Sequence, residues 1–201
     1  FEMANRVFSV GGSADFQTGQ LELTTDGKVH LSLLNGLKQQ FPGYFPSAFL
    51  ESEGWVDVDL TIQGDRERLI PQGEMKIHGI EVAVRNIREP VQIETGRVIF
   101  GDEQIRIPQD QPLEGRALGG VARVHGHLNR IGTRYQEMKL AIWSHNNTFR
   151  VADTANLTFD SRLDISAGNV TDLRSWDVGG RVNIVDGLVY RDFSLFEKQV
   201  T

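Results

Sequence analysis

The sequence contains no cysteine and no long apolar run, and each of these absences excludes a class of protein. Without cysteine the 201 residues can form no disulfide, no thiolate metal site and no thiol nucleophile. No stretch approaches the ~20 apolar residues that a membrane-spanning helix needs. Basic charge is not in excess either, because the formal net charge is -6. We therefore expect no nucleic-acid partner and no docking on anionic lipid surfaces.

The sequence is instead rich in glycine and in segments where apolar and polar residues alternate. There are 21 glycines against 6 prolines, which is typical of strands joined by tight turns. Residues 56–62 read Val-Asp-Val-Asp-Leu-Thr-Ile, and similar alternation recurs along most of the chain. A period of two places apolar side chains on one face of a strand and polar ones on the other. We predict an all-β fold, an elongated and curled sheet of antiparallel or mixed strands.

The apolar positions of these segments are the candidate functional residues. Too little helix is predicted to cover a long sheet, so the sheet has to fold on itself as a sandwich, a barrel or an open trough. An open trough would expose its apolar lining to acyl chains, whereas a closed core would bury the same residues, and the sequence does not distinguish the two. The set comprises Val56, Val58, Leu60, Ile62, Ile80, Val82, Val84, Val98, Phe100, Leu157, Phe159, Val182 and Ile184.

Two local features interrupt the alternation near the start of the chain. Asp26-Gly27 is a type I′ turn dipeptide between two alternating segments, and it predicts a hairpin there. Leu33, Leu34, Leu37 and Phe41 fall at helical spacing and are followed by Pro42-Gly43. This spacing predicts one short amphipathic helix over residues 32–41, which would plug one end of a β core or form a lid over a groove.

The domain organisation reads as a single unit. No linker or low-complexity stretch divides residues 1–201. The chain starts at Phe1 without an initiator methionine and stops after a strand-like stretch. We expect both ends to be boundaries within a longer chain whose sheet continues past them.

No catalytic or metal-binding motif is evident. The serines lie in no GxSxG elbow, and neither a P-loop nor a nucleotide-binding GxGxxG is present. His125 and His127 share a face of one predicted strand, but no third ligand is indicated. The carboxylates alternate with apolar residues, as on a solvated strand face. We expect no catalytic site, no metal and no cofactor.

The succession of segments resembles a known family. A predicted hairpin and a leucine-rich helix precede GWVDVDLTIQG at residues 54–64, and GRVIF follows at residues 96–100. Residues 179–195 read GGRVNIVDGLVYRDFSL and are the most family-like part. This order is similar to that of the TamB family, the translocation and assembly module subunits of the AsmA-like group. The resemblance covers roughly residues 20–200 and consists of degenerate positions.

The resemblance implies a location, a fold and a role. TamB-like proteins are anchored in the inner membrane and cross the periplasm, and their sheet curls into a trough called a β-taco. The implied role is outer-membrane biogenesis, by moving phospholipid between membranes or by assisting the assembly and secretion of β-barrel proteins such as autotransporters. The implied partners are phospholipid acyl chains or unfolded outer-membrane protein strands and, for the intact chain, a TamA-like Omp85 protein. Two alternatives remain open: an edge-strand chaperone and a closed structural β-sandwich of a surface protein.

Overall fold

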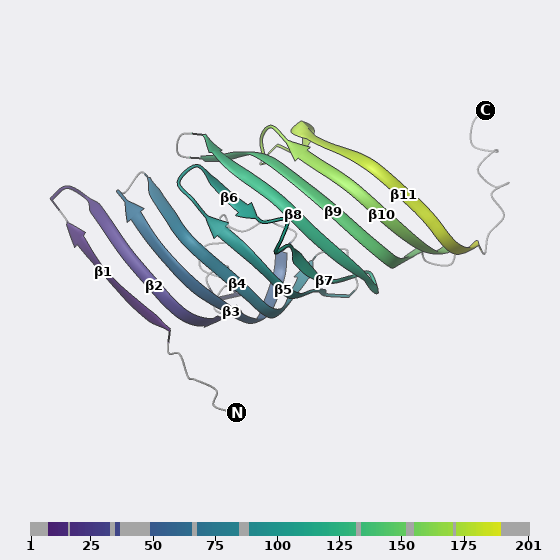
Figure 1. Ribbon diagram of the computed structural model, residues 1–201, viewed down its shortest axis with the longest axis horizontal. Coiled ribbons are helices and arrows are strands. Elements are labelled where there is room, and N and C mark those ends of the chain that lie inside the picture. Colours follow the sequence, from purple (N-terminus) through teal and green to yellow (C-terminus); the bar gives the residue numbers. More distant parts are fainter. Residues whose placement is uncertain are drawn as a thin grey trace, which may run out of the picture.

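The fold is one sheet of eleven strands in a computed structural model (Figure 1). The structure describes residues 8–15, 17–32, 35–36, 49–65, 68–84, 89–131, 134–151, 155–170 and 172–189. A single-turn 3-10 helix, η2 (Leu173–Ser175), precedes the last strand. The strands are β1 (Ser9–Asp15), β2 (Gln20–His30), β3 (Phe49–Gly64), β4 (Leu69–Val84), β5 (Val91–Phe100), β6 (Gln104–Ile107), β7 (Leu113–Ala117), β8 (Gly120–Ile131), β9 (Arg134–Val151), β10 (Ala155–Ala167) and β11 (Trp176–Val189).

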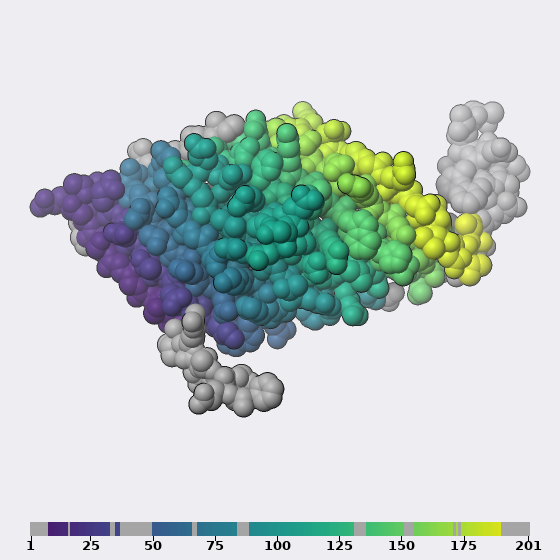
Figure 2. Space-filling view, in the orientation of Figure 1, coloured from purple at the N-terminus to yellow at the C-terminus, as the bar shows by residue number. Residues whose placement is uncertain are grey.

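The strands follow one another in sequence order, and every pairing is antiparallel. The coloured bands of Figure 2 run from purple to yellow across the face turned to the reader, as expected when each strand lies beside its predecessor. At ~4.8 Å per strand the sheet extends for roughly 50 Å. The prediction of an all-β, elongated antiparallel sheet is confirmed.

In the middle of the sheet, two short strands share the place of one strand between β5 and β8. Between β5 and β8 lie two short strands end to end: β6 pairs with residues 99–100 and 126–129, and β7 pairs with residues 92–95 and 120–124. Residues 108–112, Pro-Gln-Asp-Gln-Pro, connect them. Proline provides no amide donor for a ladder, so this segment leaves the sheet and rejoins it.

The predicted hairpin at Asp26-Gly27 is wrong. Both residues lie inside β2, where Asp26 pairs with Ser9 and Asp59, and Gly27 pairs with Val58. Ladders on both sides of β2 outweigh the local turn preference of the dipeptide. The actual turn precedes β2, and there the Asp15 carboxylate accepts hydrogen bonds from the Gln17 backbone N–H at 2.8 Å and the Thr18 hydroxyl at 2.7 Å.

The short helix predicted over residues 32–41 lies mostly outside the described residues. Ser32, Asn35 and Gly36 are helical, and the structure describes no other residue of that range. The helix therefore stays a prediction.

Irregular pairing bends the longest strands. The β3–β4 register shifts between Gly54 and Trp55, and the β9–β10 register shifts between Phe159 and Ser161. Gly54 has a φ of 106° and lies so close to β4 that a Cβ atom would meet the Gly79 carbonyl oxygen at 2.2 Å. An extra residue on one strand increases twist and bends the strand locally. These bulges also keep the apolar residues on one side of the sheet where simple alternation would move them to the other.

Candidate functional site

One face of the sheet carries most of the apolar residues of the long strands. Residues directly opposite in an antiparallel ladder point to the same side. Val56 lies opposite Val29 on β2 and Ile77 on β4, and Met75 links Val58 to Val98 on β5. Pairings of this kind continue through Phe100, Ile105, Leu128, Met138 and Ala167 to Trp176 on β11. We call this side the apolar face and the opposite side the polar face.

The candidate functional residues predicted from the sequence all lie on the apolar face where their side chains are described, but they differ in how deeply they are buried. Val84 lies in β4, and its side chain is outside the described part of the structure. Val56, Ile80 and Val98 are buried, whereas Val182 and Ile184 are exposed. The intermediate members are Val58, Leu60, Ile62, Val82, Phe100, Leu157 and Phe159.

Burial on the apolar face differs between strands: β3, β4 and β10 carry buried residues, whereas β11 is exposed. Val56 and Ile77 are 2% and 3% exposed and form the centre of a small core with Ile80. Val182 and Ile184, by contrast, are 58% and 62% exposed. β11 ends the sheet order and is exposed along all its 14 residues. The apolar face is thus a packed core at β3–β4 and an open apolar surface at β11.

Sequence reasoning missed part of this face. Ile77 at its centre was not among the candidates, nor were Leu140 and Ile142 on β9, which pair with Ile165 and Leu163. Their signal was present, since residues 138–142 read Met-Lys-Leu-Ala-Ile and alternate as clearly as residues 56–62. The alternation of residues 74–77 identifies Ile77 in the same way.

Buried polar side chains interrupt the apolar face at β9 and β10. The hydroxyls of Ser144 and Ser161 hydrogen-bond at 2.6 Å, and both side chains are buried. Asn147, beyond the bulge, is 4% exposed, and its Oδ1 has no hydrogen-bond partner among the described residues. Ser144 continues the alternation of Leu140 and Ile142, and the bulge that follows places Asn147 and then Phe149 on the apolar face.

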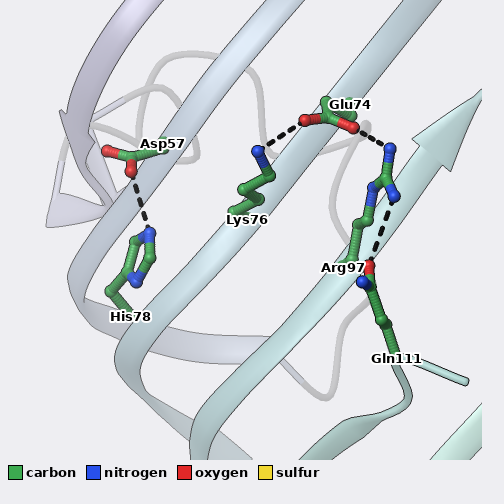
Figure 3. A network of polar contacts seen from close by, with 6 residues as sticks. All are labelled: Asp57, Glu74, Lys76, His78, Arg97 and Gln111. Atoms are coloured by element: carbon green, nitrogen blue, oxygen red, sulfur yellow. Dashed lines mark hydrogen bonds and ion pairs between the residues drawn. The ribbon is translucent and has the colours of Figure 1, made fainter.

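The polar face carries a linked set of charged side chains on β4 and β5, and a separate His78–Asp57 pair beside it (Figure 3). Lys76 Nζ donates to Glu74 Oε1 at 2.8 Å, and Arg97 pairs with the other carboxylate oxygen of Glu74. Arg97 also donates to the side-chain oxygen of Gln111 at 3.3 Å. The hydrogen bond from Lys76 lowers the pKa of Glu74 below its ordinary value, Arg97 lowers it further, and burial acts in the opposite direction.

Two histidine–carboxylate pairs lie on the same face. His78 Nε2 is 2.8 Å from Asp57 Oδ2, and His145 Nδ1 is 2.8 Å from Asp160 Oδ1. Neither pair has a third metal-ligating side chain beside it, because the described residues contain no group of three His, Asp or Glu side chains that could hold a metal. His125 and His127 occupy the polar face of β8, as their spacing predicted.

Comparison with known proteins gives no relative. No family model, no curated protein and no solved structure matches this chain. Among the described residues there is also no helix with the length and apolar character needed to cross a membrane. The function therefore has to be argued from the two faces and the edges of the sheet.

Proposed function

We propose that this chain is a periplasmic segment of a TamB-like protein whose apolar face shields lipid acyl chains during phospholipid transport to the outer membrane. In the intact protein the segment would be tethered to the inner membrane and would act with an Omp85-type outer-membrane partner. The protein would thereby also assist the assembly of β-barrel proteins. The segment itself would perform no catalysis.

The observation that carries the proposal is the apolar face of a single long sheet, which is open to solvent along β11. Soluble proteins rarely leave large contiguous apolar surfaces in water, and where they do the surface binds something. The row Val178, Val182, Ile184 and Val189 on β11 is between 46% and 62% exposed. Each CH₂ group transferred from water to such a surface gains ~0.8 kcal/mol. An exposed apolar row along a 14-residue strand suits a long flexible chain better than a compact ligand.

The test is native mass spectrometry of the protein incubated with phospholipid. Val182 and Asn183 offer a matched pair, because they are adjacent on β11, both exposed, and on opposite faces of the sheet. Val182→Asp is expected to reduce the bound phospholipid, and Asn183→Asp, with the same added charge, is expected to leave it unchanged. A protein that binds no phospholipid would contradict the proposal.

A second function is favoured by the edge of the sheet. β11 pairs only with β10 among the described strands and leaves a 14-residue edge. Exposed edges accept extended chains by backbone hydrogen bonding, so an unfolded outer-membrane protein strand is the alternative ligand. An amphipathic peptide that bound here would slow amide hydrogen exchange along β11 and leave β4 unchanged. The remaining alternative, a closed structural β-sandwich of a surface protein, predicts that neither phospholipid nor peptide binds.

A further inference from the structure

The polar face contains a row of arginines around an exposed tryptophan. In the ladders from β7 to β11, Glu114, Arg123, Trp143, Arg162 and Arg181 lie directly opposite one another in turn. The Arg123 guanidinium lies over the Trp143 ring, 5.7 Å from its centroid. Trp143 is 44% exposed, so the ring is accessible from solvent. The row gathers three cations and one carboxylate on a chain whose net charge is -6.

The arginines of this row are incompletely neutralised. Arg162 and Arg181 are neighbours on β10 and β11, and like charges directly opposite in a sheet repel. Among the described residues neither has an ion-pair partner. Arg123 pairs with Glu114 at 2.9 Å, but both side chains are more than one third exposed. Such a surface pair contributes little and opens readily. An anion bound here would relieve the repulsion.

A hollow of about 320 Å³ lies beside this row. Its lining includes Arg123, Trp143, Arg162, His125 and Gln109, with Ala141 among them. On β9 the polar-face positions run Lys139, Ala141, Trp143 and His145, so Ala141 is the one small residue between longer side chains. Gln109 comes from the segment that connects β6 and β7. The hollow therefore results from the small side chain of Ala141 and from the connecting segment, residues 108–112, which leaves the sheet beside it.

Two carboxylates, Glu114 and Asp164, lie close to the positive charges around the hollow. Asp164 lies opposite Ala141 on β10, across from His125 on β8. Asp160 is already engaged with His145 and with the Asn146 backbone N–H at 2.9 Å. The two guanidinium groups of the lining therefore face Glu114 and Asp164, with Arg181 adding charge from the edge strand.

We infer that this hollow binds the phosphate group of a phosphate ester. Arginine presents several N–H donors in a fork that matches phosphate oxygens. Arg123 and His125 on β8, Arg162 on β10 and Gln109 of the connecting segment line the hollow from three parts of the chain, which suits a tetrahedral anion better than a planar carboxylate. The Trp143 ring provides a flat apolar surface for the esterified group. The site is on the opposite face from the acyl-chain surface, so it does not rest on the proposed function.

Calorimetric titration with phenyl phosphate tests the inference, with benzoate as the planar carboxylate of similar size. Phenyl phosphate is expected to bind more tightly than benzoate. Arg162→Gln is expected to weaken binding by about tenfold or more, because it removes charge-assisted hydrogen bonds. Arg150→Gln is the matched control, since Arg150 is also exposed and lies on β9 outside the hollow. Circular dichroism of each variant verifies that the sheet is retained.

Ala141→Leu tests whether binding depends on the volume of the hollow as well as on its positive charge. It fills the hollow, changes no charge and is expected to abolish binding of phenyl phosphate. Inorganic phosphate and co-sedimentation with phosphatidylglycerol vesicles then identify the source of the phosphate group, a soluble ester or a lipid headgroup. Absence of phenyl phosphate binding, equal affinity for benzoate, equal effects of Arg162→Gln and Arg150→Gln, or unaltered binding by Ala141→Leu would each overturn the inference.

Discussion

Val56 on β3 lies directly opposite Ile77 on β4, and these two side chains are the least exposed apolar residues of the described sheet, at 2% and 3%. Ile184 has the same orientation relative to the sheet, but it is 62% exposed on β11. One alternating pattern thus produces a packed core in one place and an open apolar surface in another. This difference separates residues that hold the sheet together from residues available to a ligand.

Ile77→Ala is expected to destabilise the protein by about 2–5 kcal/mol, because it removes buried methyl groups and leaves a cavity. Ile184→Ala is the matched control and is expected to change the free energy of unfolding by less than about 0.5 kcal/mol, as is usual at exposed positions. Urea unfolding followed by circular dichroism measures both. Equal destabilisation by the two substitutions would show that β11 is packed as tightly as β4.

Adjacent glycines on β11 provide a second matched pair. Gly180 has a φ of 135°, and a Cβ atom there would meet the Arg162 carbonyl oxygen at 2.2 Å, whereas Gly179 has no atom within 4 Å of a Cβ position. Gly180→Ala is expected to cost about 1–3 kcal/mol of stability through backbone strain. Gly179→Ala is expected to be neutral or slightly stabilising, because alanine restricts the unfolded chain. The unfolding midpoints in urea report the difference, and similar values would contradict the backbone geometry of β11.

Glu74 should make the protein sensitive to acid. Its pKa is lower in the folded chain than in the unfolded one, so the unfolded state binds a proton first as the pH falls. The contribution of Glu74 is therefore complete above the ordinary glutamate pKa of about 4.3 and is lost as the pH falls through the lowered folded value. Glu74→Gln and Lys76→Gln should both flatten the dependence of stability on pH in this range. A pH profile of unfolding that neither substitution alters would contradict the role of the Lys76–Glu74 contact.

The strand content and the two faces of the sheet could be predicted from the sequence because they depend on a period of two. The alternation at residues 56–62 corresponds directly to β3, and all candidates with described side chains lie on one face. Which of them are buried could not be predicted, since Val56 and Val182 have the same local pattern. Burial depends on neighbouring strands and on the bend at Gly54, which involve residues distant in sequence.

The hairpin was predicted wrongly and the arginine row was not predicted for a related reason: both depend on how strands pair. Asp26-Gly27 has the local preference of a turn, but the ladder to β3 runs through both residues and the ladder to β1 includes Asp26. Arg123, Trp143, Arg162 and Arg181 are spread over four strands, and only the register brings them into one row. Reading one strand at a time cannot reveal a site built across strands.

Site-specific photo-crosslinking at two adjacent positions of β11 tests the central claim most directly. Val182 lies on the apolar face opposite Ser161, and Asn183 lies on the polar face opposite Asp160. With a photoreactive side chain at Val182, the account predicts a covalent phospholipid adduct after irradiation in the presence of lipid, and no adduct from the same group at Asn183. Absence of an adduct at Val182, or equal labelling at both positions, would contradict the assignment of the apolar face as the lipid-binding surface.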